Sequence, residues 1–247
     1  MAGHSKWAKV KRFKGAIDAK RGKIFSKLSK EITIAAKIGG GDPNMNPRLR
    51  MALLKSRAAN MPGDNIDRAI KKGTGGGEAV MFEDLTYEIY APHGVALLVE
   101  LSTDNRNRTA AEIRSLVTKS GGSIATAGSV SRLFQRKGQI IVSREAANED
   151  QLMELALEAG AEDFKAETQG YEILTEPGNF EAVHKKVEAR GIKPDVAEIT
   201  SLPTVTVPLN GDAAIAAVNK LIDALEENDD VKDVYSNAEF PDEPVKA

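Results

Sequence analysis

The sequence of 247 residues predicts an α+β protein in which a small three-helix domain precedes two α/β domains, the last of them inserted in the middle one. Two observations predict this class. Apolar residues recur at helical spacing through about the first 75 residues, whereas short β-rich runs alternating with helical segments fill most of the rest. Between the two parts, four glycines stand within the six residues 73–78. With 41% hydrophobic residues, the chain is long enough to bury a core in each domain.

The first predicted helix covers residues 24–38. Its apolar residues are spaced by three or four positions and share one helical face: Ile24, Leu28, Ile32, Ala35 and Ile38. A second stripe, about 120° away around the helix, consists of lysines: Lys20, Lys23, Lys27, Lys30 and Lys37. We therefore expect one face to pack against other helices and the other face to remain charged.

Two further helices complete the predicted N-terminal domain. The Gly-Gly-Gly-Asp-Pro run of residues 39–43 ends the first helix, because glycine favours the left-handed cap and proline cannot continue the hydrogen bonds. Asn46 and Pro47 have the pattern of an N-cap followed by the first helical residue, and predict a helix to about Asn60. A short third helix follows over residues 63–72.

The glycine-rich residues 73–78 predict a linker. Glycine loses more conformational entropy than any other residue when it is held in a regular element. A phosphate-binding loop would need the opposite order of elements, with a strand before it and a helix after it. We therefore place a domain boundary near residue 78, so that residues 1–78 form the basic helical domain.

The periodicity beyond the linker changes to that of strands. The expected elements are two strands joined by a Pro-His-Gly turn, then a helix and a further strand: 86–91, 95–101, 109–119 and 130–135. Thr109 and Glu112 have the spacing of a capping box, which predicts that the helix opens at Thr109.

From Gly138 onward the elements follow the order strand, helix, strand, strand, helix, strand: 139–143, 149–159, 163–167, 171–175, 178–190 and 196–202. This βαββαβ order is typical of ferredoxin-like domains. A helix over 211–227 and a strand over 231–236 remain, and can combine with the earlier β-rich segment. We therefore predict a discontinuous ferredoxin-like domain, 79–136 plus 204–240, with a ferredoxin-like domain inserted at 137–203. The acidic tail from Glu239 is expected to fray.

Charge divides the chain in the same place. The net charge is −2, but residues 1–75 contain 18 Lys and Arg against 5 Asp and Glu, a charge of +13. The remaining 172 residues contain 16 Lys and Arg against 31 Asp and Glu, a charge of −15. Such a split predicts that the N-terminal part meets a polyanion while the rest has another task.

The most basic stretch is residues 1–30, with ten Lys and Arg and one acidic residue. We interpret residues 1–14 as a flexible arm whose cations contact phosphates and whose Trp7 stacks on a base or sugar. Lysines outnumber arginines, which favours contact with the backbone over reading of bases. The candidate nucleic-acid-binding residues here are Lys6, Trp7, Lys9, Lys11, Arg12, Lys14, Lys20, Arg21, Lys23 and Lys27. The alternative is a solvated lysine face beside a tryptophan that packs on its own domain.

A second candidate lies in the polar segment 104–109, Asp-Asn-Arg-Asn-Arg-Thr, which we expect to be a loop between a strand and a helix. Arg106 and Arg108 have the chemistry to pair with phosphate or with the carboxylates of a partner. The alternative is an N-cap loop with two solvated arginines. The sequence alone does not separate these two interpretations.

No pattern indicates catalysis or a bound cofactor. The chain has no cysteine and none of the motifs of a P-loop, a nucleophile elbow or a zinc protease. His4, His93 and His184 lie in separate segments, where we expect turn or surface positions. The paired carboxylates at 226–227 and 229–230 end a helix, where charge runs are usually solvated. We expect no enzymatic activity, no cofactor and no metal.

Neither a signal-peptide pattern nor an apolar run of membrane-spanning length is present, so we expect a cytoplasmic protein with no membrane partner. We favour a monomer.

Several strings resemble those of the YebC/PmpR family, which includes the mitochondrial translational activator of cytochrome oxidase. They extend over essentially the whole chain: Met1-Ala2-Gly3-His4-Ser5-Lys6-Trp7, 19–25, 39–43, 46–50, 60–62, 66–73, 103–109, 121–122 and 155–163. The resemblance implies a helical first domain followed by two ferredoxin-like domains, and no known enzymatic activity. Family members are described both as DNA-binding transcriptional regulators and as ribosome-associated translation factors that relieve stalling, notably at proline runs.

Our leading hypothesis is a non-enzymatic, nucleic-acid-binding regulator of gene expression that resembles the DNA-binding members. The alternative is a translation factor on the ribosome, whose basic domain would bind ribosomal RNA; the absence of a major-groove recognition pattern weakly favours RNA. A third hypothesis, an enzyme with a small-molecule site between the two α/β domains, follows only from the habit of ligands to bind at domain interfaces.

Overall fold

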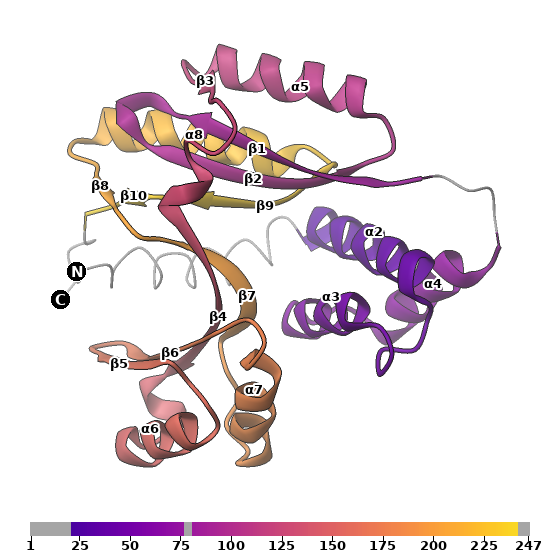
Figure 1. The fold of residues 1–247 in the computed structure, drawn as a ribbon, viewed down its shortest axis with the longest axis vertical. Helices are drawn as coiled ribbons and strands as arrows, with labels where there is room; N and C mark the ends of the chain where they lie inside the picture. Colours follow the sequence, from indigo (N-terminus) through magenta and orange to yellow (C-terminus); the bar gives the residue numbers. More distant parts are fainter. Residues whose placement is uncertain (1–20, 77–80, 242–247) are drawn as a thin grey trace. The chain divides into compact units, whose positions relative to one another are not determined.

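The computed structural model describes residues 21–76 and 81–241 (Figure 1). Among these residues, 81–135 and 201–241 form one compact unit, and 21–76 and 136–200 form a second. The N-terminal part is helical and the later parts are sheets covered by helices, which confirms the predicted α+β class. In the described part of the chain, no helix is both long and apolar enough to cross a membrane.

Three helices form the N-terminal part of the second unit: α2 (Arg21–Gly39), α3 (Pro47–Ala58) and α4 (Gly63–Thr74). Their shared core contains Ile32, Ala35, Leu49, Ala52, Leu53, Met61 and Ala69. The predicted apolar stripe is therefore correct in its centre and wrong at its end, because the side chain of Ile38 is 65% exposed. Ile38 lies in the last turn of α2, one residue before the helix ends.

The turn between α2 and α3 confirms the predicted caps. Gly40 adopts a left-handed backbone conformation (φ +83°) directly after α2. The side-chain oxygen of Asn46 accepts a 3.1 Å hydrogen bond from the Leu49 amide at the start of α3. The amide group of the same side chain donates to the carbonyls of Ala35 and Gly40, each at 2.8 Å. Asn46 therefore caps α3 and also binds the C-terminal end of α2.

The assignment of Gly73 to the linker is wrong. Gly73 lies within α4, at the point where this helix crosses α2. A Cβ atom at position 73 would lie 2.5 Å from the carbonyl oxygen of Thr33 and 2.7 Å from Cβ of Ala36. The hydroxyl of Thr33 also donates a 3.1 Å hydrogen bond to the Ala69 carbonyl of α4. Close helix packing therefore explains this glycine.

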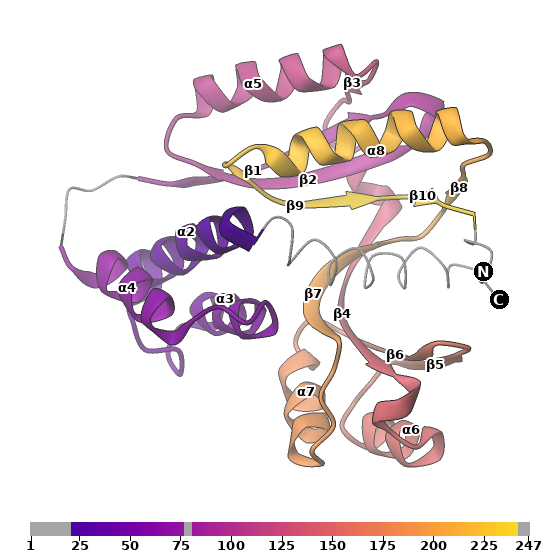
Figure 2. The same ribbon diagram turned by 180° about the vertical axis from the view of Figure 1, so that it is seen from behind.

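The first unit contains a four-stranded antiparallel sheet in the order β3-β1-β2-β9. Its strands are β1 (Glu83–Tyr90), β2 (Ala96–Thr103), β3 (Ser123–Ile124) and β9 (Val231–Ser236). Two helices, α5 (Arg106–Lys119) and α8 (Asp212–Glu227), cover the same face of this sheet (Figures 1 and 2). Because β1 lies between β2 and β3, the β2-α5-β3 segment forms a split βαβ unit of the ferredoxin-like kind.

Two predictions for this unit are wrong in detail, and one short strand is not predicted. The expected strand 130–135 is a 3₁₀ turn (Ser131–Leu133) that leads directly into a long strand, β4 (Phe134–Ser143). The strand β3 is not predicted from the sequence, because it has only two residues and shows no alternation of apolar and polar positions. Both of its residues are exposed. Glu239 is not frayed, since it lies in β10 (Ala238–Glu239), which pairs in parallel with β8 (Val207–Pro208).

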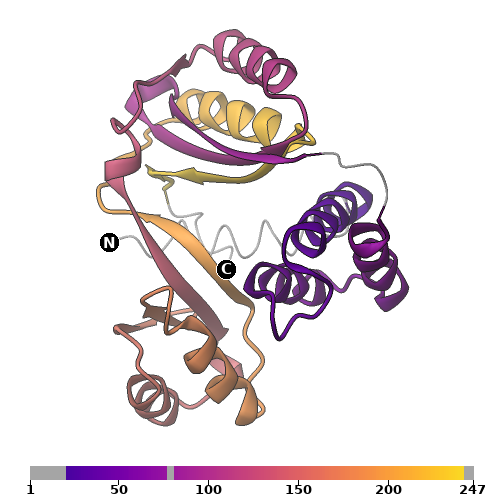
Figure 3. The ribbon, with the colours of Figure 1, turned by 45° about the vertical axis from the view of Figure 1, so that its right-hand side comes forward.

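The inserted part of the second unit has the predicted βαββαβ order, and Figure 3 shows its strands and helices from another side. After β4 come α6 (Glu149–Glu158), β5 (Asp163–Glu167), β6 (Gly170–Thr175), α7 (Phe180–Ala189) and β7 (Val196–Pro203). The sheet order is β5-β6-β4-β7, with β6 antiparallel to both β5 and β4. The core includes Ile140, Val142, Leu152, Phe180 and Val183.

Gly138 does not separate two strands as predicted, because β4 passes through it without interruption. A Cβ atom there would lie 2.2 Å from Oγ1 of Thr175 and 2.8 Å from Cβ of Phe180. The division of the chain into two compact units consequently falls within strands. One boundary lies between Gln135 and Arg136 of β4, the other between Thr200 and Ser201 of β7.

Within the second unit, helix α3 contacts the part of the chain that forms the β5-β6-β4-β7 sheet and its helices. Met51 and Leu54 of α3 pack against its core. Arg50 forms an ion pair with Glu181 of α7, and Nζ of Lys55 lies 3.9 Å from Oε2 of Glu198. The second compact unit therefore joins two of the three predicted domains, and the three-domain division itself stays a prediction.

Candidate nucleic-acid interface

The predicted binding residues are distributed over three regions. Those of the arm lie outside the described residues: Lys6, Trp7, Lys9, Lys11, Arg12, Lys14 and Lys20. Arg21 is the first residue of α2, while Lys23 and Lys27 lie in its first two turns. Arg106 and Arg108 belong to the other compact unit. The structure therefore brings together only the residues of α2.

The lysines of α2 reach solvent to different extents, and Ile34, which lies on the same stripe, is buried. Ile32 and Ala35 are fully buried, whereas Lys23 and Lys37 are exposed and Lys27 and Lys30 are partly exposed. The lysines lie at the positions where the helical period predicts the charged stripe. This arrangement leaves lysine side chains of α2 at the surface, where they can meet phosphate.

The acidic residues near these lysines are few. Residues 21–76 contain 12 Lys and Arg against 4 Asp and Glu. Glu31 of α2 is already paired, because Oε1 of its carboxylate accepts a 2.9 Å hydrogen bond from Nε of Arg48. Lys71 and Lys72 lie in the last turn of α4, where positive charge is favoured by the helix dipole. The helical segment therefore has a large net positive charge.

Arg106 and Arg108 are not in a loop as predicted, because α5 begins at Arg106. The N-cap is Asn105, whose side-chain oxygen accepts a 3.1 Å hydrogen bond from the Arg108 amide. The capping box expected at Thr109 is therefore wrong by about one turn. Nη1 of Arg106 forms a 3.0 Å ion pair with Glu83, and the side chain of Arg106 remains 67% exposed.

Arg108 has a different environment, built around Asp230. Nη2 of Arg108 donates to Oδ2 of Asp230 at 2.8 Å and to Oδ1 of Asp104 at 2.9 Å. The hydroxyl of Thr109 donates to the same Asp230 oxygen at 2.6 Å. The hydrogen bond and charge of Asp230, followed by those of Asp104, raise the pKa of Arg108 above its ordinary value. Arg108 is therefore held by contacts within its own unit.

The expectation that the carboxylates near residue 230 are solvated is wrong for Asp230, whose exposure is 6%. No local pattern separates Asp230 from its acidic neighbours. Its burial follows from the antiparallel pairing of β2 with β9, which brings the turn before β9 to the start of α5.

The expectation of turn or surface histidines is correct for His93 and wrong for His184. His93 lies in the β1–β2 turn with φ 63°, and His4 lies outside the described residues. His184 is buried on α7, where it stacks on Phe180 with ring centroids 5.7 Å apart. Burial lowers the pKa of His184, although Glu188 and Glu181 oppose this effect. Residues 21–76 and 81–241 contain no cluster of His, Cys, Asp or Glu that could hold a metal ion.

Comparison with known proteins identifies relatives over the whole chain. A family model described as the TACO1/YebC protein N-terminal domain matches residues 5–76. A second model, described as the TACO1/YebC second and third domain, matches residues 82–238.

Full-length relatives are named as regulatory proteins. A probable transcriptional regulatory protein of Desulforapulum autotrophicum is 54% identical over 247 residues and covers 100% of both chains. A protein of Opitutus terrae with the same description is 51% identical, also over 100% of both chains.

A solved structure has the same fold. The crystal structure of a conserved hypothetical protein from Aquifex aeolicus matches with a TM-score of 0.79 and 46% identity, covering 94% of this chain and 95% of that one. Together with the two family models, this similarity shows that the chain belongs to the TACO1/YebC family.

Proposed function

We propose that this protein is a nucleic-acid-binding regulator of transcription that contacts the phosphate backbone through its N-terminal helical segment. The observation that carries the proposal is the charge of that segment, with the lysines of α2 at its surface, in a chain that is acidic elsewhere. Positive charge concentrated on one part of a protein favours phosphate contact through the release of counterions. The relatives named as probable transcriptional regulatory proteins agree with this function.

The contacts proposed for this interface are the ten arm and α2 residues identified from the sequence, with Arg106 as an additional contact from α5. Lys23 and Lys27 lie on successive turns of α2, so both can follow one strand of the backbone. Arg108 is a weaker candidate, because its guanidinium already donates to Asp230 and Asp104.

The proposal is tested by measuring the affinity of the purified protein for duplex DNA and for structured RNA over a range of salt concentrations. For DNA, the logarithm of the affinity should fall with a slope of about −0.9 for each phosphate contacted. Reversing the charge of Lys23 and Lys27 to Glu should weaken binding and flatten this slope. Neutralising the arm, with Lys6, Lys9, Lys11, Arg12 and Lys14 replaced by Gln, should do the same.

The matched control reverses two lysines of the other unit, Lys119 on α5 and Lys220 on α8, to Glu. Both side chains are exposed. This control changes the net charge equally, so its binding should stay closer to that of the wild type. A flat salt dependence of the wild type, or equal losses in the two double variants, would refute the proposed interface. Tighter binding to RNA than to DNA at equal salt would favour the translation alternative.

A further inference from the structure

The inserted part of the second unit has a cluster of basic residues, although the net charge of its segment is negative. Residues 136–200 contain 8 Lys and Arg against 14 Asp and Glu. Half of these cations fall within nine positions at the end of α7 and just beyond it: Lys185, Lys186, Arg190 and Lys193. One acidic residue, Glu188, lies among them. We call these four cations the α7 cluster.

The other cations of this segment have partners. Lys137 pairs with Glu162 and Glu176, Arg144 with Glu149, and Lys165 with Asp163. Arg136 also takes part in an interaction. By contrast, no side chain of the α7 cluster forms an ion pair or hydrogen bond with any described residue, and all four are exposed. The cluster therefore keeps a net positive charge within an otherwise acidic segment.

Two acidic residues lie close to the cluster along the chain, and one of them is directed elsewhere. Glu181, one turn before Lys185, forms its ion pair with Arg50 of α3. Oε2 of Glu188 lies 3.4 Å from Nδ1 of His184, and this carboxylate offsets one of the four positive charges, which leaves a net charge of +3. The i,i+4 pairing that normally compensates exposed helical lysines is consequently absent at Lys185. Lys186 and Arg190 are themselves separated by four positions, so two like charges stand next to each other.

Stabilisation of the helix explains only part of this pattern. A cation in the last turn interacts favourably with the helix dipole, and Lys186 occupies that position. Lys193 lies four residues beyond the end of α7, after the left-handed Gly191 (φ +75°), where the dipole effect has fallen off. Placing like charges at i,i+4 opposes helix stability, so the cluster as a whole is better explained by an external anion.

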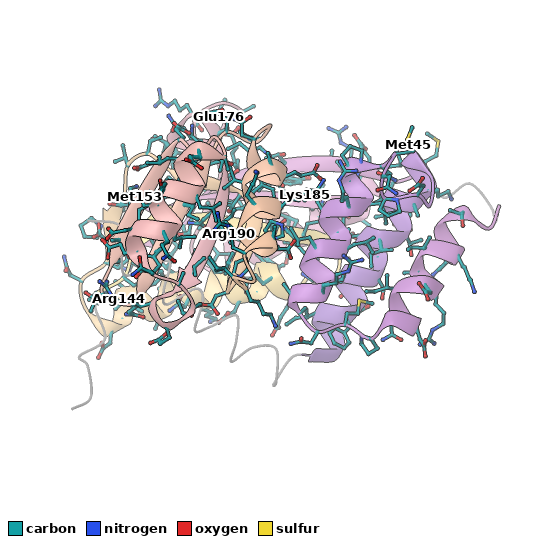
Figure 4. All side chains as sticks on the ribbon, turned by 90° about the horizontal axis from the view of Figure 1, so that it is seen from below. Met45, Arg144, Met153, Glu176, Lys185 and Arg190 are labelled. Atoms are coloured by element: carbon teal, nitrogen blue, oxygen red, sulfur yellow. The ribbon has the colours of Figure 1, made fainter. Side chains whose placement is uncertain are left out.

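We propose that the α7 cluster is a second contact surface for the phosphate backbone of a nucleic acid, in addition to the residues proposed above. This inference rests on the proposed function. Lys186 and Arg190, four positions apart, lie on one side of the helix and differ by about 6 Å along its axis, so both can reach the backbone of one strand, whereas Lys185 and Arg190 lie about 140° apart around the helix. Figure 4 shows the protein from below and labels Lys185 and Arg190. The cluster has cations without aromatic residues, so it supplies affinity for the backbone and no reading of bases.

The test compares two variants that each remove four positive charges. In the first, Lys185, Lys186, Arg190 and Lys193 are replaced by Gln. In the matched control, four exposed basic residues of the other unit are replaced by Gln: Arg114, Lys119, Arg132 and Lys220. Affinity for duplex DNA and for structured RNA is measured for both variants and the wild type across salt concentrations. Thermal unfolding of each variant checks that the fold is retained.

The α7 variant should bind at least about tenfold more weakly at roughly 0.1 M salt, and its salt slope should fall by about 0.7–0.9 for each phosphate that it no longer neutralises. The control should keep the slope of the wild type. A larger decrease with one polymer identifies DNA or RNA as the nucleic acid that reaches α7. If the wild type and the arm variant behave as the proposed function requires, but the α7 variant matches the control on both polymers, only this inference is overturned. A flat salt dependence of the wild type overturns both.

Discussion

Nη2 of Arg108 donates a 2.8 Å hydrogen bond to Oδ2 of Asp230, joining the first turn of α5 to the turn before β9 across 122 positions of the chain. The same carboxylate oxygen accepts the buried hydroxyl of Thr109 at 2.6 Å. Between these two segments the chain forms all the elements from β4 to β7. Asp230 therefore links the two separate stretches of chain that make up this unit, at a point where no short loop connects them.

We expect the replacement of Asp230 by Ala to destabilise this unit. It would leave the Thr109 hydroxyl without its strong acceptor and would remove one carboxylate from Arg108. Removing a buried hydrogen-bond partner costs about 1–3 kcal/mol of unfolding free energy. Urea unfolding followed by circular dichroism measures this change. The control, Glu154→Ala on the exposed face of α6, should change stability by less than about 0.5 kcal/mol. Equal stability of the two variants would contradict a structural role for Asp230.

Replacing Arg106 and replacing Arg108 should have different effects on stability, although the sequence predicts that both residues contact nucleic acid. Arg108→Ala should lower stability, because this guanidinium bridges Asp104 and Asp230. Arg106→Ala should leave stability nearly unchanged, because its ion pair with Glu83 is exposed to solvent. If Arg106 contacts phosphate, its removal should also reduce the salt slope of DNA binding by about one unit. Binding and melting measurements on both variants test this prediction. A destabilised Arg106→Ala variant beside an Arg108→Ala variant of unchanged stability would contradict it.

Glu88 should make stability depend on pH. Its carboxylate accepts hydrogen bonds from the amides of Gly128, Val130 and Ser131, which hold the segment before β4. Burial alone would raise the pKa of Glu88, but these backbone hydrogen bonds outweigh burial and lower the pKa from its ordinary value. A lowered pKa means that the contribution to stability is complete above the unfolded value of about 4.5 and disappears as pH falls through the folded value.

Glu88→Gln should therefore be less stable than the wild type at pH 7, by about 1–2 kcal/mol. The difference should shrink as the pH falls below about 4.5. Urea unfolding of both proteins between about pH 3 and 7 measures this difference. Glu145→Gln, at an exposed position in the turn after β4, is the control and should show no such dependence. A gap between wild type and Glu88→Gln that stays constant over this range would contradict the assignment.

Local patterns predict most of the elements after residue 138. Each strand there is bounded by turn residues, and each helix has an apolar face of its own. In α6, the cap at Asn148 also marks where the helix begins. The Asn46 cap is equally visible in the sequence, because an N-cap acts within three residues. These features depend on neighbours in sequence, so the sequence contains enough information to place them.

The features that the sequence does not predict depend on distant contacts. Gly138 resembles a strand break until Phe180 and Thr175 are placed against it. Asp230 resembles its solvated neighbours until Arg108 and Thr109 meet it. At the candidate interface, the charge of the segment is visible in the sequence. The lack of acidic partners around the α7 cluster is visible only in the structure, because Glu181 pairs with an arginine on a different helix.

Gly73 gives the sharpest test of such a distant contact, because local and tertiary arguments predict opposite signs. In an isolated helix, Gly→Ala is favourable by up to about 1 kcal/mol, so Gly73→Ala would stabilise α4 if only local propensity mattered. In the structure, the new Cβ would lie 2.5 Å from the backbone oxygen of Thr33, and backbone cannot move aside as a flexible side chain can. Overpacking of this kind costs about 1–3 kcal/mol.

We therefore expect Gly73→Ala to lower the unfolding free energy and to loosen the packing of α4 on α2. Gly63→Ala is the matched control, since Gly63 opens the same helix and a Cβ there would meet nothing within 4 Å. The control should be neutral or slightly stabilising. Chemical denaturation of the two variants gives the sign directly, and hydrogen exchange at the α4 amides locates the change. A stabilised Gly73→Ala variant would show that local helix propensity outweighs the close contact with α2 at this position.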